Sequence, residues 1–198
     1  MNATLSSEIA VAAARLVVEE GMDYGPAKRK AARALGQQAM RAAQLPGNDE
    51  VEGEVRAYLS LFHADTQPAE LAALRALAEV WMERLAEFRP HLTGAVWRGT
   101  ATRLNNVHLQ LFCDDSKAAE IALLNGRIDY DVASHRGPRG NDVDALLIST
   151  PCARLGEPVT LVLSILDHDD LRGALRPDGQ GRPERGDLAA LRKLGPAG

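Results

Sequence analysis

The chain has 198 residues, of which 45% are hydrophobic and 25% charged, and its formal net charge is −4. This length suits one sizeable core or two small domains, and the composition is that of a globular protein. The acidic balance excludes a global electrostatic footprint for nucleic acid or for an anionic membrane. No apolar run approaches the roughly 18 residues of a membrane span, and no basic region precedes an apolar segment at the start. We therefore expect no membrane contact and no secretory signal.

The two cysteines, Cys113 and Cys152, have neither a CxxC partner nor a histidine at zinc-ligand spacing. This pattern is typical of reduced thiols, so we expect a cytoplasmic protein. Cys113 stands at the end of a predicted strand with no base in its sequence neighbourhood, and we expect it to be unreactive.

The first ninety residues show helical periodicity, and Pro46 and Pro90 interrupt it. Leu71, Leu74 and Ala78 illustrate the spacing, because they recur on one face of a helix. Helices are predicted at 6–20, 26–35, 48–62 and 67–88. We assign residues 1–90 to a helical module and expect it to serve as the surface for any protein partner.

Beyond residue 90 the apolar period becomes two, as in Val107, Leu109 and Leu111. Strands are predicted at 93–97, 107–111, 128–132, 143–149 and 159–166, with helices at 116–124 and 187–194 and a Gly/Pro-rich loop at 173–186. Helices followed by strands indicate an α+β fold, here with a sheet that has one buried and one open face. We assign 91–172 to this core and 173–198 to a tail.

The stretch with the clearest chemical meaning runs from Leu92 to Ala101 and reads Leu-Thr-Gly-Ala-Val-Trp-Arg-Gly-Thr-Ala. A glycine after a short strand lets the backbone approach a phosphate closely. With the strand that begins near Asn106, this stretch resembles the core motif of the nucleotidyltransferase fold. The resemblance implies a small mixed sheet, with ligand contacts at Gly94, Ala95, Arg98 and Thr100. Arg98 would hold a phosphate bidentately, or else be an ordinary surface charge.

The family's second strand carries Asp-x-Asp, whose carboxylates face one side and share two magnesium ions. Asn106 and His108 stand at those positions here. Asparagine is neutral and imidazole is a poor magnesium ligand, so the resemblance implies a degenerate member that binds a nucleotide or another phosphorylated molecule without metal. Asn106, His108 and Gln110 would line the ligand cleft; the alternatives are a solvated strand face or one covered by the N-terminal helices.

An intact Asp-x-Asp does occur at Asp142 and Asp144, after a loose echo of the glycine turn at 133–137. The interval from Ser134 is too short to hold a helix, so this match ranks second. If the protein is active, it would be a magnesium-dependent nucleotidyltransferase that uses Asp142 and Asp144, or Asp129 and Asp131, as catalytic carboxylates. Asp142 or Asp144 could lie in the same cleft as His108, and Asp129 or Asp131 could pair with His108 to move a proton. A third hypothesis is a non-catalytic protein-interaction module.

Two charged clusters have a plainer explanation. A basic stretch consists of Lys28, Arg29, Lys30, Arg33 and Arg41. We expect it to pair with the acids at 49–54 rather than with nucleic acid. The run Asp167-His168-Asp169-Asp170 looks like a metal site, but adjacent residues rarely converge on one ion, and we expect Asp169 and Asp170 to cap a helical segment starting at Leu171 instead.

The whole chain is also similar to a family of short proteobacterial proteins, some of which are labelled UDP-N-acetylmuramate–alanine ligase. Such ligases need a glycine-rich ATP loop with Lys-Ser or Lys-Thr, which this sequence lacks. We therefore do not expect ligase activity. We also expect no obligatory cofactor, with magnesium bound only if the protein is catalytically active.

Overall fold

The computed structural model describes residues 2–37, 40–41, 44–136, 142–171, 177 and 181–194. The chain divides into two compact units, each with its own internal contacts. The helical unit comprises Met1–Pro68 and Thr100–Asn105, and the sheet unit comprises Ala69–Gly99 and Asn106–Gly198. The α+β class predicted from the sequence is confirmed.

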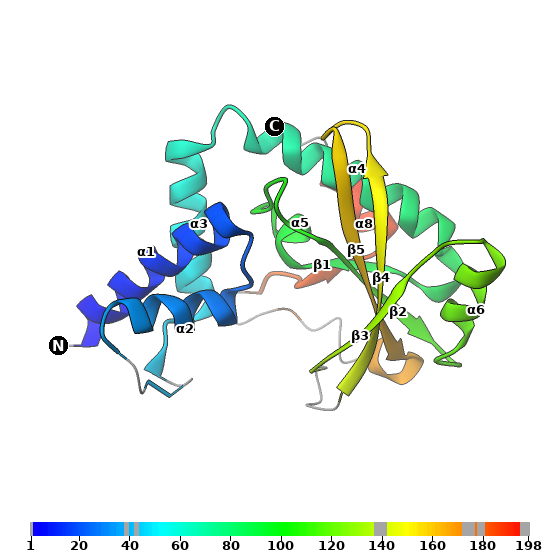
Figure 1. Cartoon of the computed structure of the whole chain (residues 1–198), viewed down its shortest axis with the longest axis horizontal. Helices are drawn as coiled ribbons and strands as arrows, with labels where there is room; N and C mark the ends of the chain where they lie inside the picture. Colours follow the sequence, from blue (N-terminus) through cyan, green and yellow to red (C-terminus); the bar gives the residue numbers. More distant parts are fainter. Residues whose placement is uncertain are drawn as a thin grey trace. The chain divides into compact units, whose positions relative to one another are not determined.

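The helical unit is built on α1 (Asn2–Glu20), which packs against both α2 (Tyr24–Ala34) and α3 (Asn48–Phe62) (Figure 1). The buried face of α1 carries Ile9 and Val17, and it meets Val51 and Val55 in one core cluster. The apolar periodicity of each segment is therefore satisfied within this unit, because each helix has one stripe to bury.

The segment 100–105 joins the helical unit through close backbone contacts. Gly21 ends α1 with a φ of +65°, and a Cβ there would lie 2.8 Å from the carbonyl oxygen of Leu104. Gln67 donates from Nε2 to the carbonyl of Ala101 at 2.9 Å. Glycine is required at residue 21 both for the left-handed turn and for this approach.

The sheet unit contains a six-stranded mixed sheet in the order β3-β4-β5-β2-β1-β6. The strands are β1 (His91–Thr93), β2 (Val107–Cys113), β3 (Asp131–Arg136), β4 (Asp142–Cys152), β5 (Glu157–Asp167) and β6 (Arg185–Gly186). The pair β2–β5 is parallel and the other four pairs are antiparallel, with β4 and β5 forming the long yellow-to-orange pair in Figure 1.

The strand alternation is confirmed, but the second face of the sheet is less open than expected. Leu109 and Leu111 of β2 are fully buried on one face, while His108 and Gln110 on the other are half-buried. On that second face Val162 and Ser164 of β5 are also buried. The polar residues therefore lie within a partly covered surface, and not on a freely solvated one.

The helices of the sheet unit are α4 (Gln67–Arg84), η2 (Ala86–Phe88), α5 (Gly94–Arg98), α6 (Ala118–Asn125), η3 (His168–Asp170) and α8 (Leu188–Lys193). Nearly all of α4 groups with the sheet, although its helical periodicity predicts a place in the helical module 1–90. The reason is local bonding: Arg75 donates to the carbonyls of Val96 and Trp97, and Glu79 pairs with Arg192 of α8.

Three sequence predictions of local structure are wrong. The stretch 93–97 was expected to be a strand, but β1 ends at Thr93 and α5 begins at Gly94, whose φ of +73° turns the chain. The strand expected at 128–132 lies at Asp131–Arg136 instead. Of the loop expected at 173–186, residues 173–176 and 178–180 lie outside the described part of the chain, and the last two residues form β6, which pairs with β1. None of the described helices combines the length and apolar character that a bilayer-spanning helix needs.

Candidate functional site

The glycine turn places a helix start directly beside His108. Thr93 pairs with His108 in the β1–β2 ladder, and the next residue, Gly94, bends the chain into α5. A Cβ at Gly94 would lie 3.7 Å from Cδ2 of His108, so the imidazole packs against the bare glycine backbone. Gly99 ends α5 with a φ of +79°, and Arg75 bonds the last carbonyls of this short helix.

A C-terminal segment, residues 183–186, is hydrogen-bonded to β1 and α5, which flank the glycine turn. Trp97 donates from Nε1 to the carbonyl of Pro183 at 2.8 Å, and Thr93 donates from Oγ1 to the carbonyl of Glu184 at 3.1 Å. Gly186 then pairs with Leu92 in the β1–β6 ladder. Arg185 of the same segment donates to Gln110, so a residue far away in the chain partly covers the polar strand face predicted from the sequence.

Two arginines converge on one carboxylate at this segment. Arg98 Nη2 lies 3.8 Å from Oε1 of Glu184, and Arg185 Nη2 lies 3.5 Å from Oε2 of the same side chain. The side chains of Arg98 and Arg185 are only 18% and 10% exposed. Arg185 also donates from Nη1 to Oε1 of Gln110, while its Nε has no hydrogen-bond partner in the described part of the chain. Burial lowers the pKa of Arg185, and Glu184 opposes that shift.

We call this group the glycine-turn site and define it by Gly94, Arg98, His108, Gln110, Glu184 and Arg185. Of the other residues predicted to bind ligand, Ala95 is the second residue of α5 and Asn106 is exposed just before β2. Thr100 belongs to the helical unit, where its buried hydroxyl has no hydrogen-bond partner among the described residues.

The predicted acidic pair does not share a face with His108. Ala145, Ser164 and Gln110 are in register across β4, β5 and β2, so their side chains point to one face. Asp142 and Asp144 alternate with Ala145 and therefore point to the opposite face. The hypothesis that one of them supplies a third carboxylate to the cleft of His108 is wrong.

Asp131 is also distant from His108. Asp131 is in register with Leu147, Leu147 with Val162, and Val162 with His108. Three inter-strand spacings of about 4.8 Å separate Asp131 from His108 by roughly 14 Å, which excludes direct proton transfer. Asp129 is exposed and precedes β3.

The acidic residues do not assemble a magnesium site in the part of the chain that the structure describes. A pocket of about 360 Å³ is lined by Ser116, Asp142, Asp144, Asp167 and Asp170. Nevertheless, no group of three or more metal-ligating side chains with suitable geometry occurs among the described residues. Asp167 instead accepts a hydrogen bond from the backbone N–H of Asp169 at 2.8 Å. Asp167 is therefore the capping side chain of η3. The segment that Asp169 and Asp170 are predicted to cap starts at Leu171 and continues into residues outside the described part of the chain.

No family model, no curated protein and no solved structure shows a detectable match to this chain.

Residues outside this site are bonded in other ways. Lys28 donates from Nζ to Oδ1 of Asn48 at 2.8 Å, and Lys30 pairs with Glu20 of α1 at 2.5 Å, so the partners of these lysines differ from the acids expected at 49–54.

Burial, reinforced by the acids at 114 and 115, raises the pKa of the Cys113 thiol to about 11. This shift agrees with the prediction that Cys113 is unreactive.

Sequence reasoning missed Glu184 and Arg185, which belong to a stretch that reads as a loop. One signal was available: Arg185 and Gly186 precede Asp187, which caps α8 by accepting a hydrogen bond from the N–H of Ala190. A short ordered segment before a capped helix can pair with a strand. The sequence does not predict that this strand is β1.

Proposed function

We propose that this chain is a catalytically degenerate nucleotidyltransferase-like protein that binds the phosphate group of a nucleotide or another phosphorylated ligand at the glycine-turn site. The observation that supports it most is the convergence of Arg98 and Arg185 on the single carboxylate of Glu184. Two weakly solvated guanidinium groups beside a glycine turn form a strong site for a planar or tetrahedral anion.

Glu184 fills the position that we assign to the phosphate. A carboxylate carries one negative charge, whereas a phosphate monoester carries nearly two and offers three acceptor oxygens. A phosphate can therefore displace Glu184 from the arginines, but it must compete with an anion tethered to the chain. We expect binding that weakens as ionic strength rises, because part of the site is open to solvent.

The same site is unsuited to two-metal catalysis. Asn106 and His108 replace the carboxylates that magnesium requires, and Asp142 and Asp144 point to the opposite face of the sheet. His108 packs against Gly94 and is best suited to contact the ligand through its ring. We infer that ligand binding by these residues does not depend on metal.

Thermal-shift assays with nucleoside triphosphates and with pyrophosphate, each with and without magnesium or manganese, test this function. Stabilisation independent of metal supports it, and metal-dependent stabilisation supports the active-enzyme alternative instead. Absence of any shift overturns it and leaves the non-catalytic interaction module as the remaining hypothesis. A ligand that binds only the folded state at 100 times its Kd should stabilise by about 2.7 kcal/mol, enough for a clear shift.

Two variants locate the phosphate. Arg98→Ala should abolish the shift, whereas Glu184→Gln should enlarge it because the competing charge is removed while the shape is kept. Arg154→Ala, in the exposed turn between β4 and β5, is the matched control and should leave the shift unchanged. An undiminished shift in Arg98→Ala would refute this location.

A second candidate function, protein interaction through the helical unit, is favoured by one specific observation. An apolar pocket of about 790 Å³ lies along α1 and α2, and Val11 on its wall is 50% exposed. A pocket of this size on a small helical unit is typical of a surface that contacts another molecule.

A further inference from the structure

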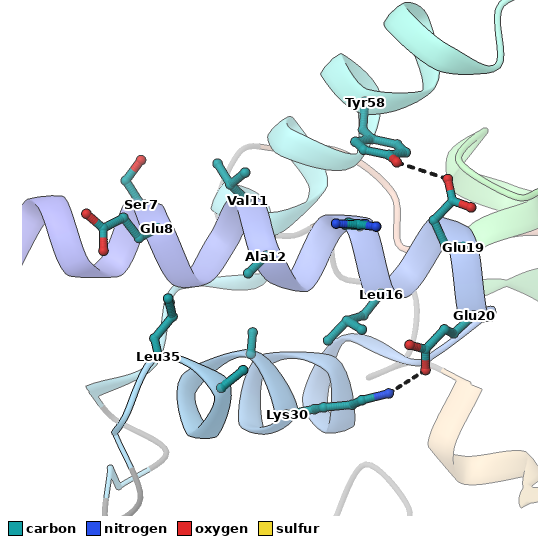
Figure 2. Close-up of a pocket in the computed structure, with 13 residues that line it drawn as sticks. Ser7, Glu8, Val11, Ala12, Leu16, Glu19, Glu20, Lys30, Leu35 and Tyr58 are labelled. Carbon is teal, nitrogen blue, oxygen red and sulfur yellow. Dashed lines mark hydrogen bonds and ion pairs between the residues drawn. The ribbon is translucent and has the colours of Figure 1, made fainter.

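One stripe of α1 is exposed along the apolar pocket. Figure 2 shows Val11 standing out from α1, with Ala12, Leu16 and Leu35 lying between α1 and α2. Val11 is 50% exposed and Leu35, at the end of α2, is 40% exposed. Water contact with these two apolar side chains is unfavourable, so burial by a partner would stabilise a complex.

Two opposite charges flank Val11 on this stripe. Glu8 precedes it by one turn and Arg15 follows it by one turn, and both line the pocket as exposed residues. Within the described chain neither side chain has a hydrogen bond or an ion pair, although Arg15 lies near enough to Glu19 to help lower the pKa of that carboxyl. Seven residues of helix separate Glu8 from Arg15 by roughly 10.5 Å along the axis, and the two side chains do not form an ion pair within the described chain.

The other charges of the pocket already have partners. Tyr58 donates to Oε1 of Glu19 at 3.0 Å, and Lys30 pairs with Glu20 at 2.5 Å, as the dashed lines in Figure 2 show. Glu8 and Arg15 are therefore the two opposite charges in this pocket that make no hydrogen bond or ion pair within the described chain, although the charge of Arg15 also acts on Glu19.

Their placement is self-complementary. Glu8 and Arg15 lie on nearly the same side of α1, because seven residues correspond to almost two full turns. A two-fold axis that crosses α1 between Val11 and Ala12 would bring Glu8 of one copy opposite Arg15 of the other, and the reverse. An interface between identical chains related by a two-fold axis requires this reciprocity.

We propose that a second copy of this chain docks on the α1–α2 pocket, with the two α1 helices antiparallel and crossing near Val11. Two reciprocal Glu8–Arg15 ion pairs set the register, and the apolar contact of Val11 with the partner's pocket supplies the burial. This interaction does not depend on the proposed phosphate site. One helix crossing buries less area than the roughly 800 Å² per partner of standard interfaces, so the dimer should depend on concentration.

Sedimentation equilibrium of the full chain over a range of concentrations tests the proposal. The wild type should show reversible association from 21.3 kDa to twice that mass. Val11→Lys should weaken the dimer at least about tenfold, because it places a charge at the centre of a desolvated contact. Val80→Lys is the matched control: Val80 is 60% exposed on α4, in the other unit, and the variant should dimerise normally.

Charge reversal gives a test that does not depend on packing. Glu8→Arg alone and Arg15→Glu alone should each weaken the dimer, because each places like charges opposite one another. An equimolar mixture of the two variants should associate again as a heterodimer, since each Arg then faces a Glu. Circular dichroism checks that both variants remain helical.

Three results would overturn the proposal: a wild type that stays monomeric at all concentrations, a dimer that Val11→Lys leaves intact, or charge-reversed variants that do not recover on mixing. Nucleotide binding by a monomer would leave the proposed function standing while this inference fails.

Discussion

The C-terminal segment requires glycine at position 186, because a side chain there would collide with Trp97. A Cβ built there would lie 2.2 Å from Cη2 and 2.4 Å from Cζ3 of Trp97. Carbon atoms attract one another best at about 3.5–4.0 Å, so the overlap exceeds an ångström. The Trp97 ring is nearly buried and is tied to Pro183 through Nε1, which leaves it little freedom to move.

Gly186→Ala should therefore lower the free energy of unfolding of the sheet unit by about 2–4 kcal/mol. Overpacking a closely packed contact costs about 1–3 kcal/mol. Displacement of the ring also breaks its hydrogen bond to Pro183, which is worth about 0.5–1.5 kcal/mol. Because β6 pairs with β1 through Gly186, the variant should also release Arg185 from Gln110.

Urea unfolding followed by circular dichroism and by tryptophan emission measures the effect. Trp97 is one of two tryptophans, so its exposure should shift the emission to longer wavelength. The clash argument requires that Gly186→Ala cost far less in a Trp97→Ala background, where the ring is gone. An equal cost in both backgrounds, or no cost in the wild type, would refute the reasoning.

Three further outcomes are expected. Alkylation of Cys113 at pH 8 should be slow in the folded protein and rapid in urea. The reason is that a thiol with a pKa of about 11 is ionised in only roughly one molecule per thousand at that pH. Rapid labelling of the native protein would contradict the burial of Cys113. Hydrogen bonds from His63 and Tyr58 hold the pKa of Glu19 below its usual value. Their stabilising effect is therefore present above pH 4.5 and is lost as the pH falls through the folded-state pKa. Glu19→Gln should flatten the acid unfolding curve of the helical unit, and an unchanged curve would argue against these bonds. Asp187→Ala should destabilise α8 by about 0.5–2 kcal/mol through loss of its N-cap, with Asp187→Asn close to wild type in urea melts.

Local sequence pattern was sufficient for much of the fold. The breaker at Pro46 located the start of α3, and the short helix predicted at 187–194 contains α8. Alternation located β2, and the lack of carboxylates at Asn106 and His108 is evident from the sequence alone. The α+β class follows from the order of these elements.

Long-range pairing decided the rest. Whether Asp144 shares a face with His108 depends on the register of three strands, and a shift of one residue in any ladder would reverse the answer. The pairing of β6 with β1, which delivers Glu184 to Arg98, joins segments some ninety residues apart, and no local propensity encodes it.

What the sequence determined by itself is therefore which side chains are present: residues 106 and 108 are asparagine and histidine, and neither provides the carboxylate oxygens that magnesium prefers. What only the tertiary structure decided is the chemistry that is present, namely two arginines around Glu184, because strand pairing between distant segments is what brings their charges together.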